Sequence, residues 1–103
     1  MYKISFFVPI DYAEKVKQAL FDEGAGTMGD YAECSWEILG TGQFKPLKGS
    51  DPFIGSPNKL ERVQELKVEM LCHEKLVKNA IKALKQVHPY EEPAYEVVKL
   101  EPF

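Results

Sequence analysis

Cysteine and histidine are scarce in this sequence, and no run of apolar residues is long enough to cross a bilayer. Two cysteines, Cys34 and Cys72, and two histidines occur among 103 residues, and neither cysteine belongs to a CxxC pair. Thiols so far apart in sequence are typical of buried, free cysteines in a cytosolic protein, so we expect no disulfide. The longest apolar run, Ile4–Ile10, is interrupted by Ser5 and Pro9, which excludes a transmembrane helix.

Positive charge is not in excess either. The formal net charge is −3, and acidic and basic residues are interleaved along the chain. Binding to nucleic acid calls for a basic face, and binding to a membrane surface calls for a polybasic run, so neither partner is expected. The N-terminus carries a single lysine, Lys3, and goes straight into a strand pattern, so we expect no signal peptide and a cytoplasmic location.

What the sequence does contain is the pattern of one folded domain over residues 1–103. Hydrophobic residues make up 45% and charged residues 28% of the chain, which is ordinary for a globular protein. Alternating apolar and polar residues predict a strand over residues 2–9, ended by Pro9. Asp11 and Glu14 have the spacing of a capping box, which predicts a helix that begins there and ends at Gly24 and Gly26.

The middle of the chain, residues 27–48, has the pattern of two paired strands. The first is predicted over residues 31–39, the segment Gly40-Thr41-Gly42 is typical of a turn, and the second begins at residues 43–45. Residues 46–60 form an extra loop, and its length makes it a candidate for function or for subunit contact. Within this loop, residues 53–55 (Phe-Ile-Gly) are predicted to fasten onto a partner subunit.

The remaining pattern predicts a strand over residues 62–72, an amphipathic helix over 73–87 and a last strand over 94–100. The order βαββαβ predicts an α+β ferredoxin-like plait, a four-stranded antiparallel sheet with two helices on one face. Phe7 and Leu71 are predicted to point to the uncovered face. Because a monomer would expose them, we expect a homo-oligomer; the alternative is scattered surface hydrophobes.

The segment richest in functional groups is residues 88–95, His-Pro-Tyr-Glu-Glu-Pro-Ala-Tyr, between the second helix and the last strand. Imidazole and carboxylate groups suit zinc or copper, so His88, Glu91 and Glu92 are candidate ligands of a divalent metal ion. Cys34 or a neighbouring subunit would complete the set. The alternative is structural: His88 lies near the helix C-terminus, where the helix dipole favours its charged form, and the prolines stiffen the turn.

Other residues are candidates for binding a small molecule. Cys34 is predicted to lie mid-strand, where it either packs in the interior or acts as a nucleophile activated by His88. The glycines at residues 24–26 and 40–42 match no Walker or dinucleotide pattern, so they form turns or, in the alternative, part of a nucleotide site between subunits. No residue is assigned a catalytic role. The candidate ligand-binding residues are Cys34, Thr41, Gly42, Phe44, Tyr90 and Tyr95.

A series of segments follows in a fixed order: Glu23–Gly26, Gly29, Tyr31, Cys34-Ser35, residues 40–46 (GTGQFKP), residues 51–55 (DPFIG), Glu61 and residues 88–95 (HPYEEPAY). In order and spacing, these segments resemble the domain inserted in bacterial Nif-three-like (YqfO-type) proteins, over nearly the whole chain. The last segment is also similar to the corresponding part of the CutA proteins, which are trimers of the same plait. The inserted domain is in turn similar to CutA and to the PII signalling proteins.

This resemblance implies a stand-alone version of the insert, that is, a non-enzymatic, oligomeric binding or regulatory module. A trimer is favoured over a dimer by analogy with CutA and PII proteins. In full-length Nif-three-like proteins the dinuclear metal site lies in the flanking core domain, so hydrolase chemistry is not implied for this chain. Two alternatives stay open: a zinc- or copper-binding protein of the CutA type, and a small hydrolase that depends on Cys34 or on bound metal.

Overall fold

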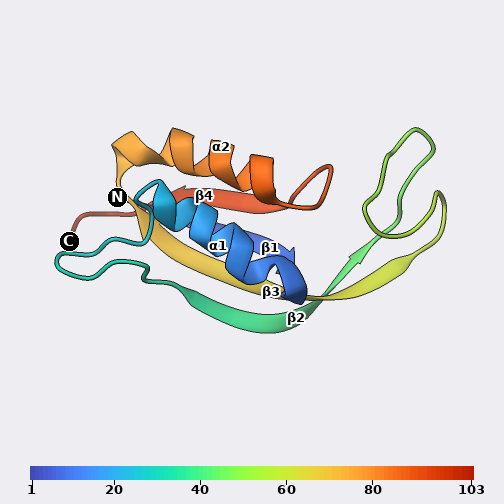
Figure 1. The fold of residues 1–103 in the computed structure, drawn as a ribbon, viewed down its shortest axis with the longest axis horizontal. Helices are drawn as coiled ribbons and strands as arrows, with labels where there is room; N and C mark the ends of the chain where they lie inside the picture. Colours follow the sequence, from blue (N-terminus) through green and yellow to red (C-terminus); the bar gives the residue numbers. More distant parts are fainter.

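One four-stranded antiparallel sheet forms the frame of the computed structural model, which describes all residues 1–103. Its strands lie in the order β2-β3-β1-β4. They are β1 (Tyr2–Pro9), β2 (Trp36–Phe44), β3 (Glu61–Cys72) and β4 (Tyr95–Lys99). Helices α1 (Ala13–Asp22) and α2 (Val77–Val87), each preceded by a 3-10 turn, cover the same face of the sheet (Figure 1). The predicted βαββαβ plait is therefore confirmed. Neither helix has the length and apolar character that a membrane-spanning helix needs.

The hydrophobic core fills the space between the two helices and the sheet. Because side chains alternate across a strand, every second residue of β1 faces the helices. The main core residues are Ile4, Phe6, Val8, Val16, Leu20, Val68, Met70, Cys72, Ala80 and Leu84. Both cysteines are free thiols. Cys72 is buried in this core, and burial raises the pKa of its thiol, so it is a packing residue.

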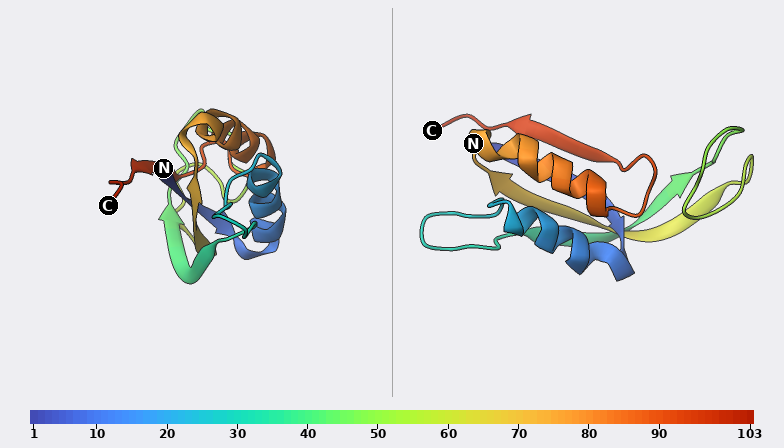
Figure 2. Two further views of the ribbon diagram at one scale, coloured as in Figure 1. Left: turned by 90° about the vertical axis from the view of Figure 1, so that its left-hand side faces the viewer. Right: turned by 45° about the horizontal axis from the view of Figure 1, so that its top comes forward.

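The face of the sheet opposite the helices is called the bare face here, because no element of the chain covers it (Figure 2). Residues directly opposite each other on neighbouring strands share a face, so the register assigns each side chain. The large apolar residues along this face include Phe7, Trp36, Ile38, Leu71 and Val98, and Val63 and Pro9 lie on the same side. Trp36, Ile38 and Val98 have exposed fractions of 57%, 52% and 48%. The predicted position of Phe7 and Leu71 on this face is confirmed.

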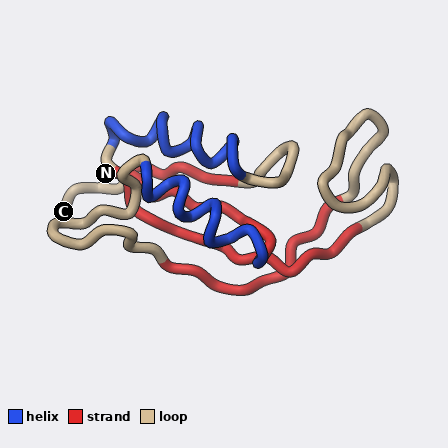
Figure 3. Tube along the Cα trace, viewed as in Figure 1, coloured by secondary structure: helices blue, strands red, loops and turns tan.

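Strands β2 and β3 form one long hairpin that runs past the rest of the sheet to the loop of residues 45–60 (Figure 3). The prediction of two paired strands within residues 27–48 is wrong, because the partner of β2 is β3. The segment Gly40-Thr41-Gly42 is extended rather than turned, with Gly40 opposite Glu65 and Gly42 opposite Val63. The hydrogen bonds along β3 hold these glycines in a strand, where glycine marks close approach of another group.

Two further local predictions differ from the structure. Asp11 lies in the 3-10 turn Ile10–Tyr12, and no side chain caps α1, so the capping box is not formed. Cys34 lies in the loop before β2, not mid-strand, and its N–H donates to the carbonyl of Gly26 (2.8 Å). This loop is tight because Gly26 has a φ of +80°, and a Cβ there would lie 2.8 Å from the Cys34 carbonyl oxygen.

Candidate functional site

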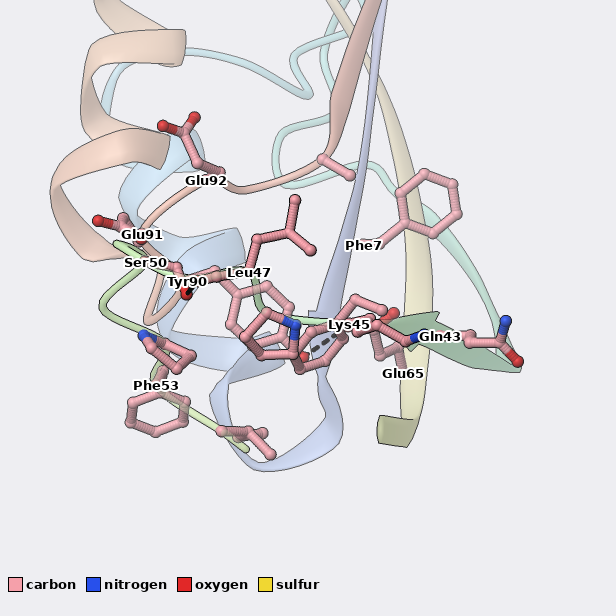
Figure 4. Close-up of a pocket in the computed structure, with 15 residues that line it drawn as sticks. Phe7, Gln43, Lys45, Leu47, Ser50, Phe53, Glu65, Tyr90, Glu91 and Glu92 are labelled. Atoms are coloured by element: carbon pink, nitrogen blue, oxygen red, sulfur yellow. Dashed lines mark hydrogen bonds between the residues drawn. The ribbon is translucent and has the colours of Figure 1, made fainter. Parts of the chain in front are cut away.

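A pocket of about 430 Å³ lies where the loop 45–60 meets the sheet and the turn between α2 and β4 (Figure 4). We call it the hairpin pocket. Its volume falls within the range of small-molecule sites, roughly 300–1,000 Å³. The aromatic and aliphatic side chains in its wall are Phe7, Phe44, Leu47, Phe53, Ile54 and Tyr90. Glu65, Glu91, Glu92 and Lys45 supply the charged groups.

A hydrogen bond between Glu65 and Tyr90 joins the sheet to the turn in the wall of the hairpin pocket. The Tyr90 hydroxyl donates to Oε2 of Glu65 over 2.7 Å. Glu65 has an exposed fraction of only 8%. Burial, together with the neighbouring Glu65 carboxylate, raises the pKa of Tyr90. The phenol therefore keeps its proton at neutral pH and acts as a donor to the carboxylate.

Gly42 of β2 makes room for the Glu65 side chain. A Cβ built on Gly42 would overlap the Glu65 carboxylate, 2.6 Å from its Cδ, whereas a Cβ on Gly40 would meet nothing within 4 Å. Glycine at position 42 is therefore required for Glu65 to reach Tyr90. Gly40, Thr41 and Gly42 also line a second hollow of about 320 Å³, which shares Glu65 with the hairpin pocket.

Aromatic contacts hold the loop 45–60 against the body of the domain. The ring centroids of Phe44 and Tyr90 are 6.0 Å apart, and Phe53 lies 6.5 Å from Tyr90 and 5.4 Å from Tyr12. The backbone N–H of Asp51 in the loop donates to Oε1 of Glu91 in the turn (3.0 Å). Phe53 thus fastens the loop to its own chain, where the sequence predicted contact with a partner subunit.

His88 is the C-cap residue of α2 and has an exposed fraction of 6%. Its Nδ1 accepts a hydrogen bond from the Tyr90 backbone N–H (3.1 Å), so Nε2 carries the proton and donates to the Phe7 carbonyl (2.7 Å). Burial lowers the pKa of the imidazole, against the opposing effects of the Phe7 carbonyl and Glu65. Neutral His88 therefore uses both ring nitrogens to tie the turn to β1.

The predicted metal ligands do not form a cluster. Glu91 and Glu92 are exposed at the rim of the hairpin pocket, and no three His, Cys, Asp or Glu side chains converge anywhere in the structure. A metal ion on His88 would first have to displace the Phe7 carbonyl or the Tyr90 N–H. Metal binding by His88, Glu91 and Glu92 stays a prediction.

The candidate ligand-binding residues separate into three places. Phe44 and Tyr90 line the hairpin pocket, and Thr41 and Gly42 line the hollow beside it. Tyr95 lies on the helix side of β4, with the Lys85 ammonium 5.4 Å from its ring centroid. Cys34 lies at the other end of the sheet from the 88–94 turn (Figure 1), so His88 does not activate its thiol.

Glu65 is the residue of the site that the sequence analysis missed. In the sequence, Glu65 is one of several charged residues that alternate with apolar residues along the strand predicted over residues 62–72. The available signal was the pair of glycines in β2, because glycine inside a strand marks close approach of another group. The glycines point to Glu65 only when the pairing of β2 with β3 is known, because that pairing places Gly40 opposite Glu65.

No family model matches the sequence. A protein of Halalkalibacterium halodurans named GTP cyclohydrolase 1 type 2 homolog is 43% identical over 100 residues, which is 97% of this chain and 27% of that protein. The crystal structure of a Bacillus cereus protein related to NIF3 superimposes with a TM-score of 0.84 at 40% identity, covering 98% of this chain and 26% of that one. Pyrococcus horikoshii CutA superimposes with a TM-score of 0.72 at 20% identity, covering 100% of this chain and 87% of that one.

These similarities confirm the resemblance to Nif-three-like proteins and the CutA-like fold. The chain spans about a quarter of the length of the curated relatives it matches. CutA shares the fold alone, since the two sequences are only 20% identical. Over nearly its whole length, this chain is similar in sequence and structure to one segment of bacterial NIF3-related proteins, and its fold is a CutA-like plait.

Proposed function

We propose that this chain is a homo-oligomeric binding or regulatory module that takes a small molecule in the hairpin pocket. The observation that carries the proposal is the pocket itself, about 430 Å³ in volume, with aromatic walls and a buried carboxylate. A largely apolar cavity with a few polar groups that converge on it is the usual form of a ligand site.

Binding, rather than catalysis, is the proposed role because both hydroxyl groups that line the pocket already donate to other groups of the protein. The Tyr90 hydroxyl donates to Glu65, and the Ser50 hydroxyl donates to the Leu47 carbonyl (2.7 Å). The Cys34 thiol lies outside the pocket. A nucleophile would need a neighbouring base or a lowered pKa.

A screen of chemically diverse fragments, followed in ¹⁵N–¹H NMR spectra, tests the binding role. We expect at least one fragment to shift the amide signals of Phe44, Leu47 and Tyr90, and to bind less tightly to a Tyr90→Ala variant. The matched control is Tyr95→Ala, because Tyr95 lies outside the pocket. Absence of any fragment that shifts these signals would refute a binding site here.

Self-association through the bare face is the second part of the proposal. Three large apolar side chains on this face, Trp36, Ile38 and Val98, are about half exposed, and a row of such residues is typical of an interface. A trimer follows from the resemblance to CutA. Light scattering after size exclusion should then give three times the chain mass of 11.7 kDa.

Adjacent residues of β2 offer a matched pair of variants for this test. Ile38 and Leu39 have nearly equal exposed fractions, 52% and 54%, but they lie on opposite faces of the sheet. We expect Ile38→Asp to lower the measured mass to that of one chain and Leu39→Asp to leave it unchanged. A wild-type monomer at tens of micromolar would contradict the proposed assembly.

A further inference from the structure

The electrostatics of the hairpin pocket narrow the kind of molecule that it accepts. Its charged lining residues are one lysine, Lys45, and three glutamates, Glu65, Glu91 and Glu92. Glu91 and Glu92 are exposed, so water screens their charge. Glu65 has an exposed fraction of only 8%. Water screens its charge least, so this carboxylate contributes most to the electrostatic potential inside the pocket.

Glu65 has no cationic partner in the fold. The ion pairs of the structure are Lys3–Glu69, Lys17–Glu14 and Lys17–Glu37, and none of them involves Glu65. Lys67 lies on the same face of β3, but its ammonium sits over the Phe7 ring, 5.8 Å from the centroid. His88 is neutral, as its hydrogen bonds and burial require.

The only polar group bound to Glu65 is therefore the Tyr90 hydroxyl. One neutral donor does not compensate a carboxylate that is removed from water, because a buried charge without a cationic partner loses its hydration and gains little in return. The cavity beside this carboxylate is thus a place where a positive charge gains more than it would in water.

Aromatic rings surround the same space. The rings of Phe44 and Phe53 both pack against Tyr90, with centroids 6.0 and 6.5 Å from the Tyr90 centroid and ring planes inclined by 53° and 49°. Rings set at such angles present several π-faces to one cavity, and a π-face attracts a cation. The aliphatic Leu47 and Ile54 complete a wall suited to the apolar body of the same molecule.

We propose that the hairpin pocket selects a monovalent organic cation with an apolar body, chemically an amine, whose charge pairs with Glu65 between the rings of Phe44, Phe53 and Tyr90. This rests on the proposed binding function of the pocket. A metal ion fits less well, since a single buried carboxylate and no clustered histidine or cysteine face the cavity. An anion would meet the buried negative charge directly.

Three probes that share a phenyl ring and a short chain test the charge preference: phenethylamine, 2-phenylethanol and 3-phenylpropanoate. Their dissociation constants are measured by ¹⁵N–¹H NMR titration at pH 7.5. We expect the amine to bind about tenfold more tightly than the alcohol, and the carboxylate to bind more weakly than both. We expect Glu65→Gln to remove most of the tenfold advantage while changing the affinity for the alcohol less than about twofold.

Two further variants separate charge from shape. Glu92→Gln removes an exposed charge from the rim of the same pocket and should leave the preference for the amine intact. Glu65→Asp keeps the charge but withdraws it by one methylene, and it should retain part of the preference. Thermal unfolding of each variant confirms that it is folded before titration.

The inference is overturned if the alcohol or the carboxylate binds as tightly as the amine, if Glu65→Gln leaves the amine affinity unchanged, or if no probe shifts the pocket signals. In the first two cases a probe still occupies the pocket, so the proposed binding function stands without the charge preference. In the last case the fragment screen described above decides the binding function by itself.

Discussion

Replacement of Gly42 by alanine tests whether β2 positions Glu65. The new Cβ would overlap the Glu65 carboxylate, so the side chain must move, and we expect this movement to break the hydrogen bond from Tyr90. A hydrogen bond to a charged group contributes about 1.5–3 kcal/mol to the free energy of unfolding. Alanine in place of glycine returns about 0.5–1 kcal/mol through reduced chain entropy. The net expectation is a loss of roughly 1–2 kcal/mol, which corresponds to about 4–16 °C in Tm for a domain of this size.

The matched control is Gly40→Ala, in the same strand and on the same face, where a Cβ would meet nothing within 4 Å. This variant should be as stable as the wild type or more stable by about 0.5 kcal/mol. Urea unfolding followed by far-ultraviolet circular dichroism at one fixed protein concentration gives both values.

A double-mutant cycle identifies the cause of the loss. If Gly42→Ala acts by breaking the bond between Glu65 and Tyr90, then it costs less in a Tyr90→Phe background, where that bond is already absent. Equal stability of Gly42→Ala and wild type, or equal losses for Gly40→Ala and Gly42→Ala, would refute the reasoning.

Two other predictions concern the turn and the loop. Burial lowers the pKa of His88 below its ordinary value of 6.5, so His88 binds a proton more readily in the unfolded chain than in the folded one. The free energy of unfolding should therefore fall as the pH drops below about 6.5, by up to about 1.4 kcal/mol per pH unit. Urea unfolding between pH 7.5 and 5.5 should show this slope for the wild type and for the exposed-site variant His73→Asn, but not for His88→Asn; an unchanged slope in His88→Asn would exclude His88 as its source. Phe53→Ala removes two aromatic contacts worth about 0.5–1.5 kcal/mol each, so trypsin should cleave the loop 45–60 roughly tenfold faster than in the wild type. The control Leu60→Ala removes no ring contact and should leave the cleavage rate unchanged. Equal cleavage rates for the two variants would show that Phe53 does not hold the loop.

The layout of the sheet and helices could be predicted because it depends on local patterns. The alternation in residues 2–9 and the apolar stripe of the second helix each lie within one element, and their order is sufficient to predict the plait. The prediction of a turn at Gly40-Thr41-Gly42 is wrong because glycine locally favours a turn, and only pairing with β3 holds this segment in a strand. Local composition carries no information about that pairing.

The site was predictable only in part, for the same reason. Tyr90 and Phe44 stand out in the sequence as aromatic residues within unusual segments. Glu65 does not, because its role depends on contact with Tyr90, 25 residues away, and with Gly42 on the neighbouring strand. His88 was assigned to a metal site or to a charged helix end, but its burial and its two hydrogen bonds appear only in three dimensions.

Seven of the fifteen residues that line the hairpin pocket come from the loop 45–60, and none of these seven belongs to the hydrophobic core. The residues that form the hydrophobic core and the loop residues that line the pocket therefore belong to different parts of the chain. Exchanges of loop residues other than Phe53 would alter the lining of the cavity at little cost to stability, because surface loops tolerate sequence change far better than packed interiors. Glu65 and Gly42, by contrast, belong to the sheet, so the part of the cavity wall that they form would stay in place while the loop changes.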